Sequence, residues 1–253
     1  MVAMNTRIEF KDVSVRYPVR LGGRQRSVMA AVAATASFGR IAGDLKSTPY
    51  VEALSGVNLS VSTGDRVGIV GRNGSGKSTL LKTVAGHMFP SIGHLRVDGD
   101  VSALLSLSSG VNPDRTGRDN LIMMSRLLAI KKTELLDFQE DVLEFSELGQ
   151  FFDLPIETYS AGMLVRYLFG AMTYRASEIM VVDEIIGAGD SFFFSKAQRR
   201  AERIFKSAKV LLIATHSREV LEGLCNRAIR IEQGKIVDDG SPRDVWEKYQ
   251  QSQ

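Results

Sequence analysis

The sequence has little of what marks a secreted or membrane-spanning protein. Its single cysteine, Cys225, excludes an internal disulfide and fits a reducing compartment. The first apolar patch is interrupted by Arg7, Glu9 and Lys11, so we expect no secretory signal peptide. No stretch approaches the roughly 18 apolar residues that cross a bilayer as a helix. A role at a membrane would therefore require docking onto a partner that is already there.

Composition and charge are ordinary. The 253 residues are 44% hydrophobic and 24% charged, which is typical of a soluble globular protein with one domain, or one large domain plus a subdomain. The net charge of +3 is too small to indicate nucleic acid as a partner. A basic cluster late in the chain predicts a solvated helix face and not a nucleic-acid surface. Its members are Lys196, Arg199, Arg200, Arg203, Lys206 and Lys209.

Residues 71–79, G-R-N-G-S-G-K-S-T, match the phosphate-binding loop pattern G-x-x-x-x-G-K-[ST]. The apolar run 66–70 predicts a buried strand before the loop, and residues 79–85 predict a helix after it, which is the context that the motif requires. Its glycines let backbone N–H groups face phosphates, Lys77 can place a charge on them, and Ser78 can ligate Mg²⁺. A chance glycine-rich turn is the alternative, which the flanking strand and helix disfavour. The expected nucleotide-binding residues are Gly71, Asn73, Gly74, Ser75, Gly76, Lys77, Ser78 and Thr79.

Apolar patterns predict the other elements of an α/β core. Alternation predicts strands at 8–17 and 57–61, with a turn or bulge where the phase slips at Lys11-Asp12. Asp98-Gly99 predicts a tight hairpin that leads into a strand at 101–107. Further expected elements are buried strands at 179–182 and 210–215, a closing hairpin at 228–237 and a last helix capped by Ser241.

Two stretches differ from this pattern. Leucines and methionines recur at helical spacing through 118–152, which predicts a helical subdomain. Residues 18–50 form an insertion, with a helix expected at 27–38. That helix either folds back on its own domain or faces a membrane or a partner. The sequence leaves both interpretations open.

Polar residues follow the predicted strands, where open α/β sheets bind ligands. Asp183 ends one apolar run, as a Mg²⁺-binding acid would. Glu184 follows it and is expected to point to the opposite face of the strand. We expect Glu184 to be the general base for an attacking water. His216 ends the next run and is expected to contact the γ-phosphate. Tyr17 is expected to stack on adenine. The alternatives are that the two acids only end a strand, that the histidine only forms hydrogen bonds within the fold, and that the tyrosine only packs in the core.

The order of these motifs resembles that of ABC-transporter ATPases. Ser160-Ala161-Gly162-Met163 opens a predicted helix and is similar to the family's signature peptide, and Asp190 stands where its D-loop acid lies. The resemblance implies an α/β fold with a P-loop NTPase RecA-like core, an antiparallel β subdomain and an inserted helical subdomain. It implies one ATP-binding domain over 1–253, with the core at about 1–109 and 176–253, the helical subdomain at about 110–175 and a surface insertion at 18–50.

The family resemblance also implies an activity. Such proteins hydrolyse ATP with Mg²⁺, here held by Ser78 and Asp183, while Glu184 and His216 act at the attacking water. The signature peptide completes the ATP site of a second copy, since a helix N-terminus favours phosphate. We therefore expect a dimer arranged head to tail around two ATP molecules.

Within the family, the chain looks most like the ATP-binding subunits of polysaccharide exporters for O-antigen, capsule or teichoic acid. The similarity lies in residues 116–120, 159–163, 224–229 and 234–237, and in the insertion at 18–50. It implies a peripheral protein at the cytoplasmic face of the bacterial cytoplasmic membrane, two copies of a separate permease as partners, and lipid-linked polysaccharide as cargo.

The chain departs from the family pattern in two places. The signature has Ala161 and Met163 where a small residue and a glutamine are usual, and residues 106–110 lack the family's Q-loop glutamine. Which group takes the place of this glutamine beside the metal ion and the attacking water is therefore open.

Other interpretations make different predictions. A GTPase would carry an Asn-Lys-x-Asp motif, which the sequence lacks. An ABC ATPase that is not coupled to transport would act in translation or repair. The translation factors join two such domains in one chain, and we expect room for one here. A non-catalytic nucleotide-binding scaffold would have lost Glu184 or His216. An ABC transporter for another cargo stays open, as do the glycan, its linkage, the host and the permease.

Overall fold

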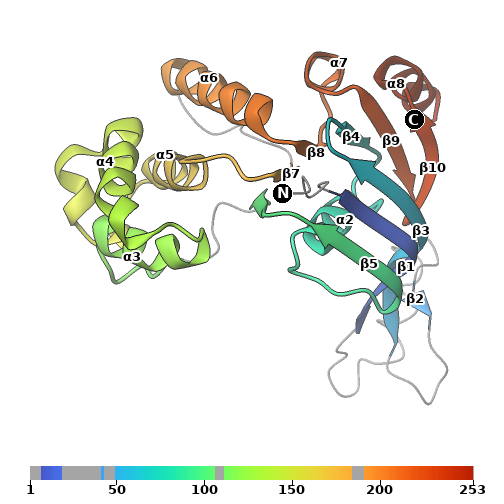
Figure 1. Ribbon diagram of the computed structural model, residues 1–253, viewed down its shortest axis with the longest axis horizontal. Coiled ribbons are helices and arrows are strands. Elements are labelled where there is room, and N and C mark those ends of the chain that lie inside the picture. The colour runs from blue at the N-terminus through green and yellow to red at the C-terminus, as the bar shows by residue number, and fades with distance from the viewer. Residues whose placement is uncertain (1–6, 19–40, 43–48, 106–110, 184–190, 253) are drawn as a thin grey trace, which may run out of the picture. The chain divides into compact units, whose positions relative to one another are not determined.

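The computed structural model describes residues 7–18, 41–42, 49–105, 111–183 and 191–252. The chain divides into two compact units (Figure 1). The first unit comprises Met1–Gly99, Val181–Asp183 and Lys209–Gln253, and the second comprises Asp100–Met180 and Glu184–Ala208. The domain boundaries expected from the sequence stay a prediction.

The first unit has a central sheet with the strand order β10-β9-β4-β8-β7. These strands are β10 (Lys235–Gly240), β9 (Arg227–Glu232), β4 (Arg66–Val70), β8 (Val210–Ala214) and the last residues of β7 (Ile179–Asp183). β4 runs parallel to β8 and β9, while β9 and β10 form the expected closing hairpin. β4 and β8 are buried along nearly their whole length, which explains their unbroken apolar runs.

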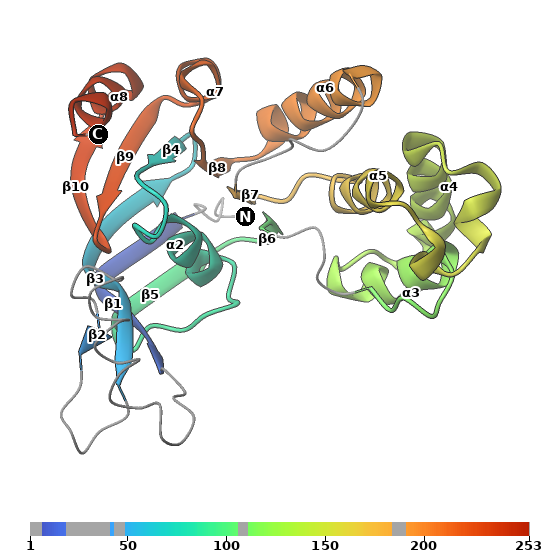
Figure 2. The ribbon, with the colours of Figure 1, turned by 180° about the vertical axis from the view of Figure 1, so that it is seen from behind.

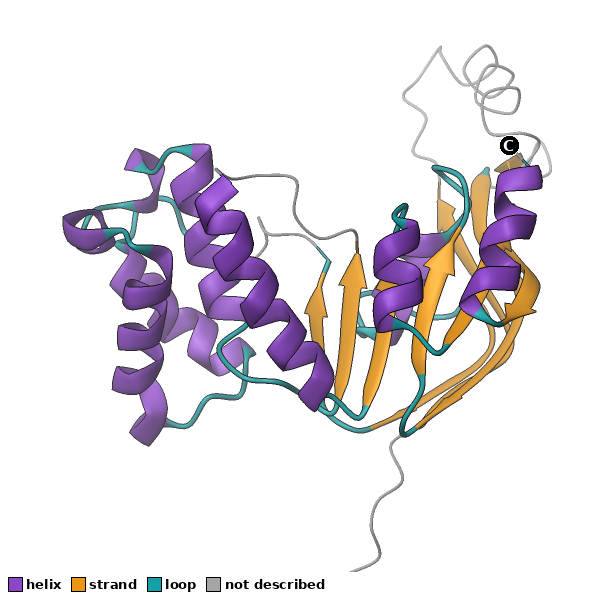
Figure 3. Cartoon of the chain, turned by 90° about the horizontal axis from the view of Figure 1, so that it is seen from above, coloured by secondary structure: helices purple, strands orange, loops and turns teal. Residues whose placement is uncertain are grey.

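Helices pack against this central sheet (Figure 3). They are α2 (Lys77–Val84) and α8 (Pro242–Gln251), and α7 (Arg218–Leu224) contacts α8. Ser241 caps α8 as expected, because its hydroxyl accepts a hydrogen bond from the Asp244 N–H at 3.2 Å. Leu221 and Trp246 share one buried cluster with Val70, the last residue of β4. β4 is therefore held by packing up to the residue that precedes the phosphate loop.

The second sheet of the first unit is antiparallel, with the order β2-β3-β1-β5. Its strands are β1 (Arg7–Pro18), β2 (Ile41–Ala42), β3 (Tyr50–Ser62) and β5 (Ile92–Asp98). The predicted phase slip in β1 is confirmed, since its register shifts against both neighbours around Asp12, which has a φ of 50°. Gly93 of β5 lies against this bulge, where an added Cβ would be 2.2 Å from the Asp12 carbonyl oxygen.

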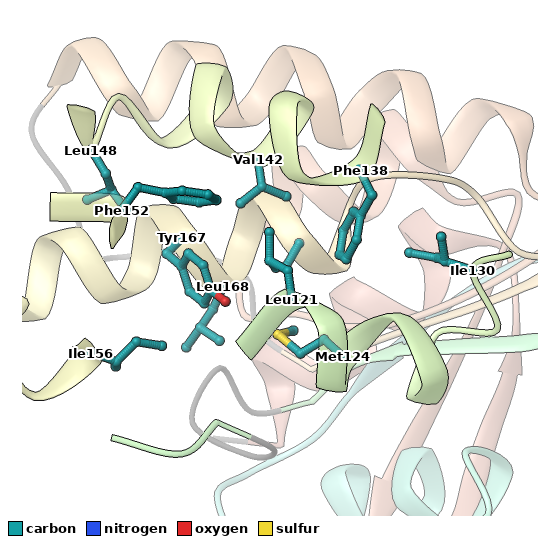
Figure 4. Packing of buried hydrophobic residues seen from close by; sticks show 11 residues of the cluster. Leu121, Met124, Ile130, Phe138, Val142, Leu148, Phe152, Ile156, Tyr167 and Leu168 are labelled. Carbon is teal, nitrogen blue, oxygen red and sulfur yellow. The ribbon is translucent and has the colours of Figure 1, made fainter. Parts of the chain in front are cut away.

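The second unit has a helical core. Its elements are β6 (Val101–Leu104), the start of β7, α3 (Gly117–Leu127), α4 (Leu135–Ser146), α5 (Ala161–Met172), α6 (Ser191–Ser207) and the short helices η2 (Lys132–Glu134), η3 (Gly149–Asp153) and η4 (Ile156–Thr158). Leu121 of α3, Phe138 and Val142 of α4, and Tyr167 and Leu168 of α5 meet in one buried cluster (Figure 4). The helical spacing of apolar residues in this stretch thus reflects a packed core.

The hairpin predicted at Asp98-Gly99 was wrong. β5 pairs with β1, whereas β6 lies beside the first residues of β7, where the Ile179 N–H donates to the Asp100 carbonyl oxygen at 2.9 Å. Gly99 has a φ of 130°, so the glycine serves the passage from one sheet to the next and not a tight turn. Both β5 and β6 therefore pair with strands that are distant in sequence.

The basic cluster is only partly a solvated helix face. Arg200 of α6 is 8% exposed. It donates to the Gly170 carbonyl oxygen at 3.1 Å and to Thr173 Oγ1 at 2.9 Å, and it forms an ion pair with Asp141. The guanidinium can be buried because its N–H groups find acceptors. Arg199 beside it is exposed, as expected.

Two expectations concern contact with a membrane or a partner. The helix predicted at 27–38 lies outside the described residues. Within the part of the chain that the structure describes, we find no helix with the length and apolar character to cross a bilayer.

Candidate nucleotide-binding site

The predicted phosphate loop connects β4 to α2 in the first unit (Figure 2). Its three glycines have positive φ angles, of 154° at Gly71, 77° at Gly74 and 119° at Gly76. A Cβ on Gly71 would lie 2.3 Å from the Ile231 carbonyl oxygen, and one on Gly76 would lie 2.7 Å from that of Ala53. Both conformation and space therefore require glycine at these two positions.

Neighbouring backbone holds the loop in shape. The Ser75 N–H donates to the Arg72 carbonyl oxygen at 3.1 Å, and the Ser75 carbonyl oxygen accepts from the Gly234 N–H at 2.7 Å. Gly234 in turn accepts from the Ser55 N–H of β3 at 2.9 Å. Loop, hairpin and antiparallel sheet are thus tied together, so that the loop is preorganised. Gly234 was expected in the closing hairpin, and its support of the phosphate loop has no signal in the sequence.

Lys77 begins α2, and its side chain folds back over the loop. It is 8% exposed. Its Nζ donates to the carbonyl oxygens of Gly71 at 2.6 Å and Arg72 at 3.2 Å. The ammonium charge and the positive end of the α2 dipole are therefore both held at the loop, and both favour a phosphate there.

The remaining loop residues divide by exposure. Asn73 and Ser78 are exposed, so their polar side chains are open to a ligand, whereas Ser75 and Thr79 are buried. Thr79 lies on the same buried face of α2 as Thr83, which follows one turn later.

Tyr17 lies beside the same helix. Its hydroxyl is 3.1 Å from Thr79 Oγ1 and donates to Met88 Sδ at 2.8 Å. The end of β1 is thereby brought next to the phosphate-loop helix, although the two lie far apart in sequence. Sequence reasoning selected Tyr17 and Thr79 but did not find Met88, because nothing local links that methionine to the loop.

Asp183 and His216 end strands near the phosphate-loop strand. Ala214, the last residue of β8, is in register with Ile69 of β4, and the Thr215 N–H donates to the Ile69 carbonyl oxygen at 3.2 Å. His216 follows directly and is exposed. Asp183 is the half-buried last residue of β7, which follows β8 in the strand order. An imidazole and a carboxylate thus stand at the ends of two strands on one side of β4.

An ion-pair network stiffens the hairpin beside the loop. Arg230 of β9, which is in register with Val70, pairs with Asp238 of β10 at 2.6 Å, and Lys248 of α8 donates to the same carboxylate at 2.9 Å. Burial alone would raise the pKa of Asp238, but the hydrogen bonds from Lys248 and Arg230 outweigh burial and lower it. The network keeps this carboxylate ionised and ties α8 to the sheet.

The signature peptide lies in the second unit, at the start of α5. Ser160 is the N-cap, and its Oγ accepts a hydrogen bond from the Met163 N–H at 3.2 Å. Ala161 is exposed, while Met163 packs at the margin of the helical core. Apart from its chain neighbours and the backbone of the helix itself, the nearest atom to an added Cβ on Gly162 would be Ser160 Oγ, at 4.0 Å. Packing within the chain therefore does not explain the glycine.

Three other predicted features lie outside the described residues. They are the general base Glu184, the D-loop residue Asp190 and the stretch 106–110.

Comparison with known proteins shows which family the chain is similar to. The family model for the ABC transporter matches residues 54–187. The O-antigen export system ATP-binding protein RfbE of Yersinia enterocolitica is 34% identical over 234 residues, covering 92% of this chain and 98% of that protein. RfbB of Myxococcus xanthus, which has the same descriptive name, is 37% identical over 202 residues, 80% of this chain but 46% of that protein. The teichoic acids export ATP-binding protein TagH of Enterococcus faecalis is 34% identical, covering 79% of this chain and 45% of its own length.

Solved structures support the fold. The ATP-binding cassette MJ0796, in a dimeric post-hydrolysis state bound to ADP and Pi, has a TM-score of 0.67 at 19% identity and covers 93% of this chain and 99% of its own. An ATP-binding subunit of an ABC transporter has a TM-score of 0.66 at 18% identity, with 96% of this chain covered. The expected α/β fold of an ABC ATPase is thus confirmed, as is the expected likeness to the polysaccharide-exporter proteins. With its phosphate loop, strand-end acid and signature peptide in family order, this chain belongs to the ABC transporter family, as one of its ATP-hydrolysing ATP-binding proteins.

Proposed function

We propose that this chain is the ATP-hydrolysing subunit of an exporter that moves lipid-linked polysaccharide across a bacterial cytoplasmic membrane. The observation that carries the proposal is the 34% identity to an O-antigen export ATP-binding protein over nearly the full length of both chains. It is supported by a preorganised phosphate loop with a lysine held over it.

In the proposed ATP site, each residue type has a separate task. Backbone N–H groups of residues 71–76 and the Lys77 ammonium bind the phosphates, and the Tyr17 ring stacks on adenine. Glu184 takes the proton of the attacking water as general base. The exposed imidazole of His216 orients this water against the γ-phosphate.

A magnesium ion fits the donors that the first unit offers. Ser78 presents an exposed hydroxyl, and Asp183 a half-buried carboxylate at the end of a buried strand. Mg²⁺ prefers hard oxygen ligands and usually binds one or two protein groups together with substrate phosphates. When bound, it would neutralise charge on the β- and γ-phosphates.

We also propose that another copy of the chain contributes residues to the ATP site. The N-terminus of α5 is capped by Ser160, its residue Ala161 is exposed, and Gly162 leaves open space around its Cα. A helix end of this kind favours an anion, and the missing side chain leaves room for one to approach the backbone. We therefore assign Ser160 to Met163 to the γ-phosphate of ATP held by a second copy, in a dimer that closes on two ATP and reopens after hydrolysis.

Mixed dimers test the shared site. Ser160→Arg chains have a damaged signature, and Lys77→Ala chains have a damaged phosphate loop. Each variant alone should hydrolyse ATP at a small fraction of the wild-type rate. When they are mixed, one of the two sites in a heterodimer combines an intact loop with an intact signature, so activity should return. No recovery, under conditions where cross-linking demonstrates heterodimers, would contradict the shared site.

The cargo, the partners and the place of action rest on the relatives. Their names assign them to O-antigen and teichoic acid export systems, and the aligned part is less than half of two of them. We propose two copies of a separate permease as partners, and a peripheral position at the cytoplasmic face of the membrane. Conformational change in the ATPase dimer would pass to the permease, which handles the lipid-linked glycan.

Gene replacement tests the cargo. A host that expresses only Lys77→Ala should retain lipid-linked glycan inside the cell and lose the corresponding glycan from its surface. Normal surface glycan together with altered uptake or drug sensitivity would show that the ATPase serves a different cargo.

A further inference from the structure

We infer that Tyr159 is a positioning residue for the signature peptide, and that Gly117 provides the space that holds it. This inference rests on the proposed function, in which the N-terminus of α5 completes the ATP site of a second copy. It concerns what fixes that N-terminus within its own chain.

Tyr159 directly precedes the helix cap Ser160, and its side chain points into the second unit. Its ring meets that of Tyr167 edge to face, with centroids 6.0 Å apart at 81°. Its hydroxyl oxygen is shielded from solvent. Burial, with a contribution from Asp153, raises the pKa of Tyr159 to about 12. The residue is thus anchored by its side chain, whereas Ser160 next to it is exposed.

Gly117 lies directly against this anchor. A Cβ added there would be 2.3 Å from the Tyr159 hydroxyl oxygen and 2.9 Å from the Phe152 carbonyl oxygen. The Gly117 carbonyl oxygen also accepts a hydrogen bond from the Tyr167 hydroxyl at 2.8 Å. Gly117 is not among the residues with a positive φ, so it is required for space and not for backbone conformation.

The backbone around Gly117 is held by one buried side chain. Asn120 is fully buried, and its amide nitrogen donates to the carbonyl oxygens of Asn112, Arg115 and Thr116 at 3.0, 3.1 and 2.9 Å. Its amide oxygen accepts from the Asn112 N–H at 2.7 Å. With its hydrogen-bonding groups satisfied in this way, the turn before α3 has little freedom to yield.

The chain before Gly117 is also bonded to the chain before Tyr159. The Ile156 N–H donates to the Arg115 carbonyl oxygen, and the Glu157 N–H donates to that of Pro113, both at 3.0 Å. The Tyr159 N–H then donates to the Ile156 carbonyl oxygen at 2.9 Å. A displaced Tyr159 side chain would therefore have to move the segment that carries Ser160, because the segment opposite it is fixed.

Gly117→Ala tests the inference. The added methyl should push Tyr159 out of place and shift the signature, which lowers kcat roughly 10²-fold, in line with the effect of an ångström-scale misplacement in other enzymes. Binding of a fluorescent ATP analogue to single chains should change less than about twofold, since the phosphate loop belongs to the other unit. Gly223→Ala is the matched control, because its Cβ meets no atom within 4 Å, and it should leave kcat unchanged.

A second substitution tests whether the contact with Tyr159 is the cause, and mixed dimers separate positioning from general loss of fold. Tyr159→Phe removes the atom at 2.3 Å and leaves ring carbon Cζ at 3.4 Å from the new methyl. It should therefore restore part of the activity of Gly117→Ala, with the Phe152 carbonyl oxygen limiting full recovery. Gly117→Ala chains mixed with Lys77→Ala chains should also regain activity, because one site of the heterodimer then has an intact loop and an intact signature. A chain that had merely unfolded would regain no activity on mixing, because it could not supply an intact phosphate loop.

Failure of the inference is distinguishable from failure of the proposed function. If Ser160→Arg alone hydrolyses ATP normally, the signature has no role and both ideas fall. If Ser160→Arg is inactive but Gly117→Ala has wild-type kcat, only the role of Tyr159 and Gly117 is overturned. The role is also overturned if Gly117→Ala loses activity that neither Tyr159→Phe nor mixing restores.

Discussion

The hydroxyl oxygen of Tyr17 lies 3.1 Å from Oγ1 of Thr79, so that the end of β1 is joined to the phosphate-loop helix by a side-chain hydrogen bond. The same hydroxyl donates its proton to Met88 Sδ at 2.8 Å, so Thr79 is the donor in the first bond. Tyr17 is half-buried, which leaves part of its side chain accessible. The anchoring of the ring through its hydroxyl and its proposed stacking on adenine can therefore be separated by mutation.

Tyr17→Ala should weaken ATP binding by about 1–2 kcal/mol, because the π face that would stack on adenine is lost. Tyr17→Phe keeps that face and loses only hydrogen bonds to protein atoms, so ATP binding should stay nearly normal. Titration with a fluorescent ATP analogue measures both, and thermal unfolding monitors stability. Equal weakening by the two substitutions at unchanged stability would contradict stacking.

Glu184→Gln should keep ATP binding and reduce turnover roughly 10²–10⁴-fold, because the amide cannot accept the proton of the attacking water. Since ATP then persists between the two copies, a dimer should accumulate. Phosphate release and size-exclusion chromatography with ATP measure the two effects. Turnover near the wild-type rate would remove Glu184 from its assigned role.

Arg200→Met should lower the free energy of unfolding by about 2 kcal/mol, because Asp141 and the Gly170 carbonyl oxygen lose a charged donor inside the second unit. Arg199→Met is the matched control on the exposed face of the same helix and should change stability by less than about 0.5 kcal/mol. Urea unfolding of both variants gives the comparison. An equal loss of stability in the two variants would show that the ion pair of Arg200 with Asp141 does not stabilise the fold.

Cys225 should react slowly with a disulfide reagent such as Ellman's reagent in the native protein. Burial raises the pKa of its thiol to about 12, with Arg66 opposing in part, so little thiolate is present at mildly alkaline pH. In the unfolded chain the pKa returns to about 8.5, and the reaction should accelerate. The stability linked to this protonated thiol is complete below the unfolded pKa and is lost as the pH rises toward 12. Native and unfolded rates that match would place the thiol at the surface.

Much of the candidate site could be predicted from sequence because its chemistry is local. The positive φ angles at Gly71, Gly74 and Gly76 follow from glycines at fixed spacing between a strand and a helix. The cap at Ser160 follows from a serine before a helical apolar pattern. Asp183 and His216 stand just after unbroken apolar runs, as strand-end ligands do. Such features depend on residues within a few positions of one another.

Tertiary structure alone decided the relationships between distant segments. Asp98-Gly99 had the composition of a hairpin turn, yet β5 paired with β1, because strand pairing depends on which edges are available and not on the turn alone. Arg200 had the spacing of a solvated face and became buried, since acceptors on α4 and α5 surround its guanidinium. The contacts of Met88 with Tyr17 and of Gly117 with Tyr159 have no local signature in the chain. Sequence by itself thus determined the family, the phosphate loop and the order of the motifs, whereas packing between distant residues determined what holds each motif in place.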